Sequence, residues 1–389
     1  MKKTFLTCMI LLFMAHLGCS SGGGGSTEYE IGDTQDEAIG TTTDDKGFER
    51  ELGPAEIQYQ SAQQFLAAGN YTEAINHLKR AVAIRPNYLE AWSELGNAQT
   101  KVKNFEGGIE AYKMALEISP DNKDLIAAIG YNHLNLEQYN EAEEYYTKLV
   151  ELDPMSYDGN VHLGFIAQKR DNIDEAIRYY ELALSTNAYD AVTMGTLATL
   201  YGKKGDKEKK LEYLNRAVEA APSNYKFMIQ LGKTYMDEKD YENAVPVFEK
   251  LVAQYPDMAA YHQNLGLALS QTDRKAEAPA ELEKAIELKG DDPLIYMFLA
   301  QFYNELDQPA KAINAAERGL KVGGQEAGLY YQWGSALSKL KDYDGAIAKF
   351  ERCRSYGDAT WSSYAVKQID RQEKLKEREK LLREQGAGE

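Results

Sequence analysis

The chain has 389 residues, of which 43% are hydrophobic and 27% charged, and its formal net charge is −17. Sequence-independent nucleic-acid binding depends on clustered Lys and Arg, so we expect no nucleic-acid partner for a chain this acidic. The three cysteines provide neither a disulfide framework nor a Cys-x-x-Cys pair, and the five histidines are widely spread. The composition therefore argues against a metalloenzyme, and we expect no metal and no cofactor.

Residues 1–18 have the pattern of a signal peptide. Lys2 and Lys3 form a positive start, and the apolar run that follows is too short to span a bilayer. The run ends in Leu17-Gly18-Cys19, which resembles a bacterial lipobox. The resemblance implies a lipoprotein in which a peptidase cuts before Cys19 and the cysteine carries the lipid, palmitate included. An ordinary cleaved signal peptide with an incidental cysteine, or a buried N-terminal helix, remains an alternative.

Residues 19–54 are predicted to be the lipidated cysteine and a disordered acidic tether. Residues 20–26 read Ser-Ser-Gly-Gly-Gly-Gly-Ser, a flexible composition, and residues 28–51 carry nine acids and two bases. In the lipoproteins that the motif resembles, a residue other than Asp after the cysteine usually implies the outer membrane, which Ser20 fits. We therefore expect a bacterial envelope protein, lipid-anchored in the outer membrane and facing the periplasm.

Residues 55–360 repeat themselves as nine gapless units of 34 residues. Pro86, Pro120 and Pro154 lie 34 residues apart. With Ala55 as position 1, apolar or small residues recur at positions 4, 7, 8 and 11, and again at 20, 24 and 27, which are the faces of two helices. Small residues at positions 8 and 20 let the two helices approach closely. Two such helices cannot bury their apolar faces alone, so the pattern predicts an all-α solenoid.

The sixth unit shows a known pattern most plainly, with Leu231-Gly232-x-x-Tyr235, then Ala244-x-x-x-Phe248, then Pro256. These residues resemble the tetratricopeptide repeat (TPR) family. The resemblance implies a right-handed solenoid of helix-turn-helix units whose first helices line a protein-binding groove, through positions 2, 5, 9, 12 and 13. Carried over, these positions give Tyr131, Leu134, Val161, Phe165, Lys169, Ile229, Lys233, Met236, Leu267, Met297 and Tyr331. The alternative is that many of these residues only pack neighbouring first helices together.

Two further segments depart from the repeat. The fifth unit has Lys207 and Lys210 where an aromatic and a small residue are expected, so we expect it to be the softest joint of the array. Residues 361–389 continue the register at Tyr364 and then become densely charged, which predicts a capping helix and tail. A coiled-coil partner site in this segment is the alternative.

No catalytic motif occurs: there is no His-Glu-x-x-His, Gly-x-Ser-x-Gly, phosphate loop or dinucleotide fingerprint. We expect His133 and His162 to be packed, and Cys353 to be a buried, unreactive thiol. The sequence therefore predicts no enzyme but a protein-binding scaffold, which holds protein or peptide partners for an envelope assembly, secretion or cell-wall process. A binding protein for cell-wall glycan or exported polysaccharide is the alternative. The oligomeric state stays open.

Overall fold

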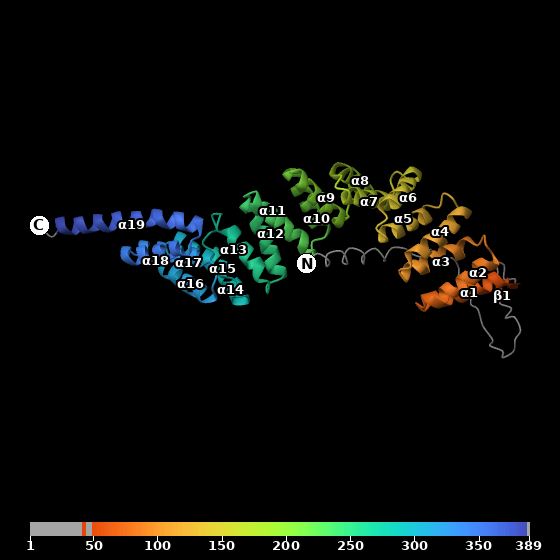
Figure 1. Ribbon diagram of the computed structural model, residues 1–389, viewed down its shortest axis with the longest axis horizontal. Coiled ribbons are helices and arrows are strands. Elements are labelled where there is room, and N and C mark those ends of the chain that lie inside the picture. The colour runs from red at the N-terminus through yellow and green to blue at the C-terminus, as the bar shows by residue number, and fades with distance from the viewer. Residues whose placement is uncertain (1–40, 44–48, 387–389) are drawn as a thin grey trace, which may run out of the picture. The chain divides into compact units, whose positions relative to one another are not determined.

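The computed structural model describes residues 41–43 and 49–386 (Figure 1). The predicted signal peptide and Cys19 lie outside these residues. Within them, no helix combines the length and apolar character needed to cross a membrane.

Part of the predicted tether forms a small β-hairpin. Strand β1 (Thr41–Thr43) pairs antiparallel with β2 (Glu49–Glu51), with Thr42 opposite Arg50. The expectation of disorder throughout the tether is therefore wrong for these residues. β-Branched threonines favour extended backbone, and the acidic composition on which the expectation rested does not prevent a three-residue pairing.

From Pro54 onward the described chain is helical and divides into two compact units. The first unit ends at Arg170 and contains α1 (Pro54–Ala67), α2 (Tyr71–Ile84), α3 (Leu89–Lys101), α4 (Phe105–Ile118), α5 (Lys123–Asn135), α6 (Tyr139–Leu152) and α7 (Tyr157–Lys169). The second contains α8 (Ile173–Thr186), α9 (Ala191–Lys204), α10 (Lys207–Ala220), α11 (Tyr225–Asp237), α12 (Tyr241–Gln254), α13 (Ala259–Leu269), α14 (Ala278–Leu288), α15 (Pro293–Glu305), α16 (Pro309–Val322), α17 (Glu326–Lys339), α18 (Tyr343–Ser355) and α19 (Ala359–Gly386). Within each unit, consecutive helices pack as antiparallel neighbours in chain order. The predicted fold class, an all-α solenoid of helix pairs with a C-terminal capping helix, is confirmed.

Each pair is joined by a turn of nearly constant geometry. Two residues before the second helix the backbone adopts a positive φ, at Gly69, Lys103, Glu137, Asp171, Gly205, Lys239, Asp307 and Lys341. The amide after the positive-φ residue commonly donates back to the carbonyl five residues earlier, as Asn104 N does to Gln99 O at 2.9 Å, which closes the first helix. An Asn or Asp at that next position often caps the second helix, as Asp240 does by accepting from Asn243 N.

The seventh pair breaks this pattern. α13 ends at Leu269 and α14 begins only at Ala278, with Pro279 in its first turn, where a missing N–H does no harm. Arg274 holds the intervening turn through ion pairs with Glu249 and Glu277, each with an N–O distance of 2.7 Å. The longer turn leaves Ser270 and Gln271 beside the groove described below.

The close approach of paired helices depends on glycine at position 8. A Cβ on Gly232 would lie 2.7 Å from Cζ of Phe248, and one on Gly96 would lie 2.6 Å from Cδ1 of Tyr112. The ring at position 24 of the second helix thus occupies the space that a side chain at position 8 would need, which agrees with the small residues in the sequence pattern.

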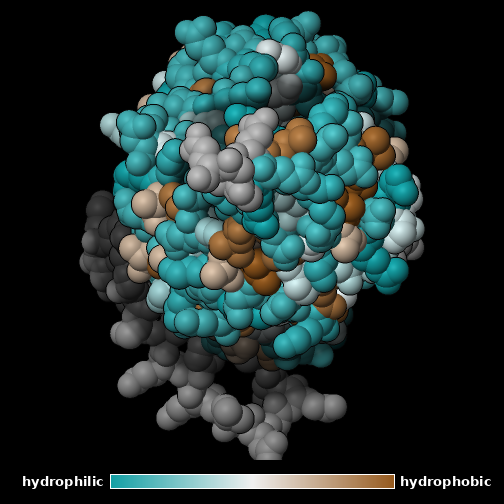
Figure 2. Space-filling model, turned by 90° about the vertical axis from the view of Figure 1, so that its left-hand side faces the viewer, coloured by the Kyte–Doolittle hydropathy of each residue, from teal (hydrophilic) through white to brown (hydrophobic). Residues whose placement is uncertain are grey.

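α19 caps the second unit by taking the place of a further first helix. It packs against α17 and α18, with Ala365 fully buried and Ser338 Oγ donating to Gln372 Oε1 at 2.8 Å (Figure 1). Lys376 pairs with Asp344, and nearer the end of α19 Lys380 pairs with Glu384 and Arg383 with Glu379 within the same helix. Seen from the end at which α19 lies, the surface is mostly hydrophilic, with hydrophobic side chains in small separate patches (Figure 2).

Candidate functional site

The predicted groove residues of the first unit lie on α5 and α7. Tyr131, Leu134, Val161 and Phe165 are half-buried, and Lys169 is exposed. Phe165 contacts Tyr139 with ring centroids 6.5 Å apart, and the Lys169 ammonium lies 5.2 Å from the Phe165 ring centroid. These residues therefore form a partly accessible aromatic and aliphatic surface.

In the second unit, Ile229, Lys233 and Met236 lie on α11, Leu267 on α13 and Tyr331 on α17. All are half-buried except Lys233, which is exposed. Met236, Leu267 and Tyr331 line the cavities described below, whereas Ile229 and Lys233 do not.

The structure places Met297 differently from the prediction. It is 7% exposed, and its Sδ would lie 2.4 Å from a Cβ on Gly328. Because Gly328, on the next first helix, has no side chain, Met297 fills that space and joins the core. It is therefore a packing residue rather than a groove residue.

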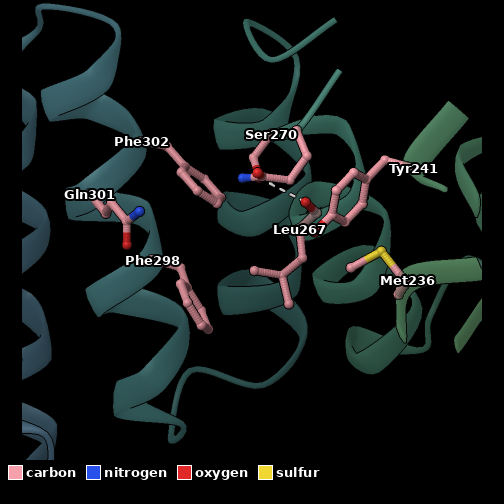
Figure 3. A pocket seen from close by; sticks show the side chains of 8 residues that line it. Met236, Tyr241, Leu267, Ser270, Phe298, Gln301 and Phe302 are labelled. Atoms are coloured by element: carbon pink, nitrogen blue, oxygen red, sulfur yellow. Dashed lines mark hydrogen bonds between the residues drawn. The ribbon is translucent and has the colours of Figure 1, made fainter. Parts of the chain in front are cut away.

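A cavity of about 310 Å³ opens between α11, α13 and α15 (Figure 3). Phe298 and Phe302 project from α15 toward Leu267, and Tyr241 and Met236 stand on the opposite side. Ser270 Oγ is held by donating to Leu267 O at 2.7 Å, and Gln271 and Gln301 complete the lining. The lining of this cavity thus combines aromatic and aliphatic side chains with three polar ones.

A larger cavity of about 540 Å³ opens between α15, α17 and α19. Tyr331, Trp361 and Tyr364 form one aromatic wall, in which Trp361 and Tyr364 meet edge to face at 6.1 Å between ring centroids. The remaining lining is polar: Gln301, Asn304, Glu305, Gln332, Ser335 and Lys339. Gln301 lines both cavities, so we name the two together the C-terminal groove.

Buried amides support the floor of the larger cavity. Asn304 Nδ2 donates to the backbone carbonyl of Gln332 at 2.9 Å and to its Oε1 at 3.1 Å. Asn304 and Gln332 are both buried, and these bonds join α15 to α17. The two helices that carry the groove are thus fixed relative to each other by a specific polar contact as well as by apolar packing.

The lysine of the groove is already neutralised. Lys339 Nζ lies 3.0 Å from Asp307 Oδ1, in the turn of the preceding pair. Glu305 differs, because its Oε1 accepts from the uncharged Gln301 Nε2 at 2.8 Å. The groove therefore combines aromatic walls, amides and a carboxylate that accepts a hydrogen bond from a neutral amide.

Sequence reasoning missed several lining residues. Phe298 and Phe302 are at repeat positions 6 and 10, outside the positions that the family resemblance supplies. Gln301 is at position 9, a groove position, but is not among the predicted residues. Tyr364 was noted only for its register, and its partner Trp361 lies at position 1 of the same frame; that register could have placed both on the groove.

The described residues contain no group of three or more His, Cys, Asp or Glu side chains that could hold a metal ion. His133 is buried, stacks on Tyr145 and contacts Gln138 through Nδ1 at 2.6 Å. His162 stacks on Tyr146 with ring centroids 4.6 Å apart. The two histidines are packed, as expected. The chemistry available in the C-terminal groove is therefore the binding of side chains by aromatic, amide and carboxylate groups.

Comparison with known families gives repeated matches along the chain. A family model described as "TPR repeat" matches residues 62–103. Models described as "Tetratricopeptide repeat" match residues 89–122, 124–154, 157–190, 191–224 and 235–302. No curated protein matches the sequence of this chain.

Solved structures with a similar fold include a double mutant of MamA, YrrB, described as a TPR protein with an unusual peptide-binding site, and a tetratricopeptide repeat protein from Parabacteroides merdae. Their sequence identities are 18%, 23% and 18%, and the TM-scores are 0.42, 0.42 and 0.39. The matches cover 44%, 48% and 64% of this chain and 97%, 96% and 98% of the other chains.

Proposed function

Because the chain belongs to the tetratricopeptide repeat family, we propose that it is a non-catalytic adaptor that holds a segment of a partner protein in its C-terminal groove. Proteins of this family bind protein or peptide partners. The observation that carries the proposal is the pair of cavities sharing Gln301, since they are lined by first helices and have aromatic and aliphatic walls. Such walls supply the buried anchors that dominate binding energy, and the amides supply orientation.

We further propose that the adaptor is lipid-anchored through Cys19 in the bacterial envelope, in the outer membrane and facing the periplasm. The support is the lipobox-like sequence at residues 17–19, followed by a Gly-rich, acidic segment. Labelling cells with radioactive palmitate tests the anchor: wild type should be labelled, and Cys19→Ala should not. Equal labelling of the two, or of neither, would count against it.

The adaptor function is tested by cross-linking in cells followed by mass spectrometry. Wild type should capture a discrete envelope protein, and Gln301→Arg, which places a bulky charge where the cavities meet, should lose it. A matched variant on α16, Glu317→Arg, should retain the capture, because Glu317 is exposed and lines neither cavity. Capture that is unchanged by Gln301→Arg would refute the groove as the binding site.

A second candidate function is glycan binding. The aromatic wall of Tyr331, Trp361 and Tyr364, set among amides, is chemistry that also suits sugar rings. Sedimentation with purified cell-wall sacculi separates the two functions. Co-sedimentation that Trp361→Ala abolishes would favour glycan, and an unbound protein with a captured partner would favour the adaptor.

A further inference from the structure

The larger cavity of the C-terminal groove carries an electrostatic preference. Its acids and bases do not balance: Lys339 lies in an ion pair with Asp307, whereas the Glu305 carboxylate meets the neutral amide of Gln301. Glu305 is exposed at the mouth of the cavity. An incoming anion would meet this carboxylate beside a lysine that is already paired, whereas a cation would gain a partner.

The aromatic wall gives the same preference independently. Tyr331 lies 5.2 Å from Trp361 and 6.2 Å from Tyr364, measured between ring centroids, and Tyr364 is 48% exposed. The faces of such rings carry negative potential and attract cations, with indole the strongest. The wall and Glu305 line the same cavity, so a cation there can contact both.

The hydrogen-bonding groups narrow the choice of cation. Gln301 uses Nε2 to donate to Glu305, which leaves its Oε1 as an acceptor, and the Glu305 carboxylate accepts from several directions. A guanidinium group is planar, carries only donors and stacks on aromatic faces, and it fits such a lining better than a compact ammonium. The chain's net charge of −17 also favours the approach of a basic segment.

We infer that the larger cavity selects an arginine side chain of the bound partner segment, while the smaller cavity takes an apolar side chain against Leu267, Phe298 and Phe302. The inference rests on the proposed function, because it names the chemistry of the segment that the adaptor holds. An acidic side chain is a poorer fit, since the lysine of this groove is paired with Asp307 within the protein.

The test uses two matched probes, Nα-acetylarginine amide and Nα-acetylcitrulline amide, which have nearly the same shape but differ in charge. They are titrated into the ¹⁵N-labelled full chain, and binding is followed at the indole N–H signal of Trp361. This signal is assigned as the one that disappears in Trp361→Phe. The arginine probe should bind about fivefold more tightly than the citrulline probe, in line with the usual strength of a cation–aromatic contact. The preference should decline as salt rises from about 0.05 to 0.5 M, because salt screens the exposed pair of the probe's guanidinium and the Glu305 carboxylate.

Glu305→Gln should reduce the preference with almost no change in side-chain size, because only the contribution of the aromatic wall then remains, and Glu317→Gln on α16 should retain the preference in full. Equal binding of the two probes, no shift of the Trp361 signal, or a preference of the same size in Glu305→Gln as in wild type would each overturn the inference. Failure of this inference can be distinguished from failure of the adaptor proposal. If the probe binds with the stated preference and no partner is captured in cells, the adaptor fails and the cavity assignment stands. If a partner is captured through the groove and the probes bind equally, only the arginine assignment fails.

Discussion

Tyr331 of α17 and Trp361 of α19 face each other with ring centroids 5.2 Å apart and ring planes tilted by 44°. The contact joins the last helix pair to the capping helix, and both rings line the larger cavity. α19 therefore does two things: it covers the apolar end of the array, and it supplies one wall of the C-terminal groove.

Trp361→Ala should loosen this capping contact. Trp361 is half-buried and packs against the core of the second unit, so the substitution should lower stability by roughly 2 kcal/mol, less than for a fully buried tryptophan. Hydrogen exchange should accelerate first in α19 and α17. The control is Tyr189→Ala, an aromatic side chain that is 84% exposed, and it should change stability by less than about 0.5 kcal/mol. Unchanged protection of α19 in Trp361→Ala would refute the contact's role.

Two glycine-to-alanine substitutions should have opposite effects. Gly232→Ala places a methyl group 2.7 Å from the buried ring of Phe248, so it should destabilise the second unit by about 1–3 kcal/mol. Gly202→Ala meets only the flexible stem of Lys210, at 3.2 Å, so the better helix propensity of alanine should raise stability by up to about 1 kcal/mol. Urea unfolding of both variants checks the signs, and destabilisation of equal size would contradict the packing described.

The first unit should lose stability in mild acid through His162. Burial lowers the pKa of His162 to about 4 from its ordinary 6.5, so the unfolded chain binds this proton more readily than the folded one. The stabilisation is therefore complete above about pH 6.5 and is lost as the pH falls toward 4, by up to roughly 3 kcal/mol. His162→Phe keeps a ring on Tyr146 without the titration. Unfolding measured at pH 7.5 and 4.5 should show a smaller drop for this variant, and an identical drop would exclude His162 as the cause.

Cys353 should resist thiol reagents until the protein unfolds. The side chain is fully buried, and burial raises the pKa of its thiol to about 11, so little reactive thiolate exists at neutral pH. A variant with Cys8→Ser and Cys19→Ser leaves Cys353 as the single thiol. In native buffer, an aromatic disulfide reagent should react with this thiol only at the rate of local opening of the structure. In guanidinium, where unfolding removes the protection of the thiol, the reaction should be at least about a hundredfold faster. Rapid reaction of the native protein would contradict the burial.

The sequence period predicted the helix pairs well because each pair repeats one packing solution. Gly232 and Phe248 are 16 residues apart, and their contact recurs at Gly96 and Tyr112 with the same spacing. A packing contact that recurs in each unit leaves a periodic pattern in the sequence, so it can be predicted without a structure.

The features that the sequence period could not predict each depend on one residue of a neighbouring helix. Met297 stands at a groove position but is buried, because the next first helix has Gly328 at position 2. Lys210, which replaces the small residue expected at its position, lies with its stem over Gly202, where the missing side chain makes room. Whether the fifth pair is also the softest remains a prediction for hydrogen exchange.

The most direct test of the groove is site-specific photo-cross-linking in the cell that makes the protein. A photoreactive phenylalanine analogue at Gln301 lies where the two cavities meet, and the same group at Glu317 on α16 lies outside both. The account predicts one discrete protein adduct from position 301, absent from position 317 and reduced in a Phe298→Asp background. The same adducts from both positions, or none from position 301, would contradict the assignment of the C-terminal groove as the partner-binding site.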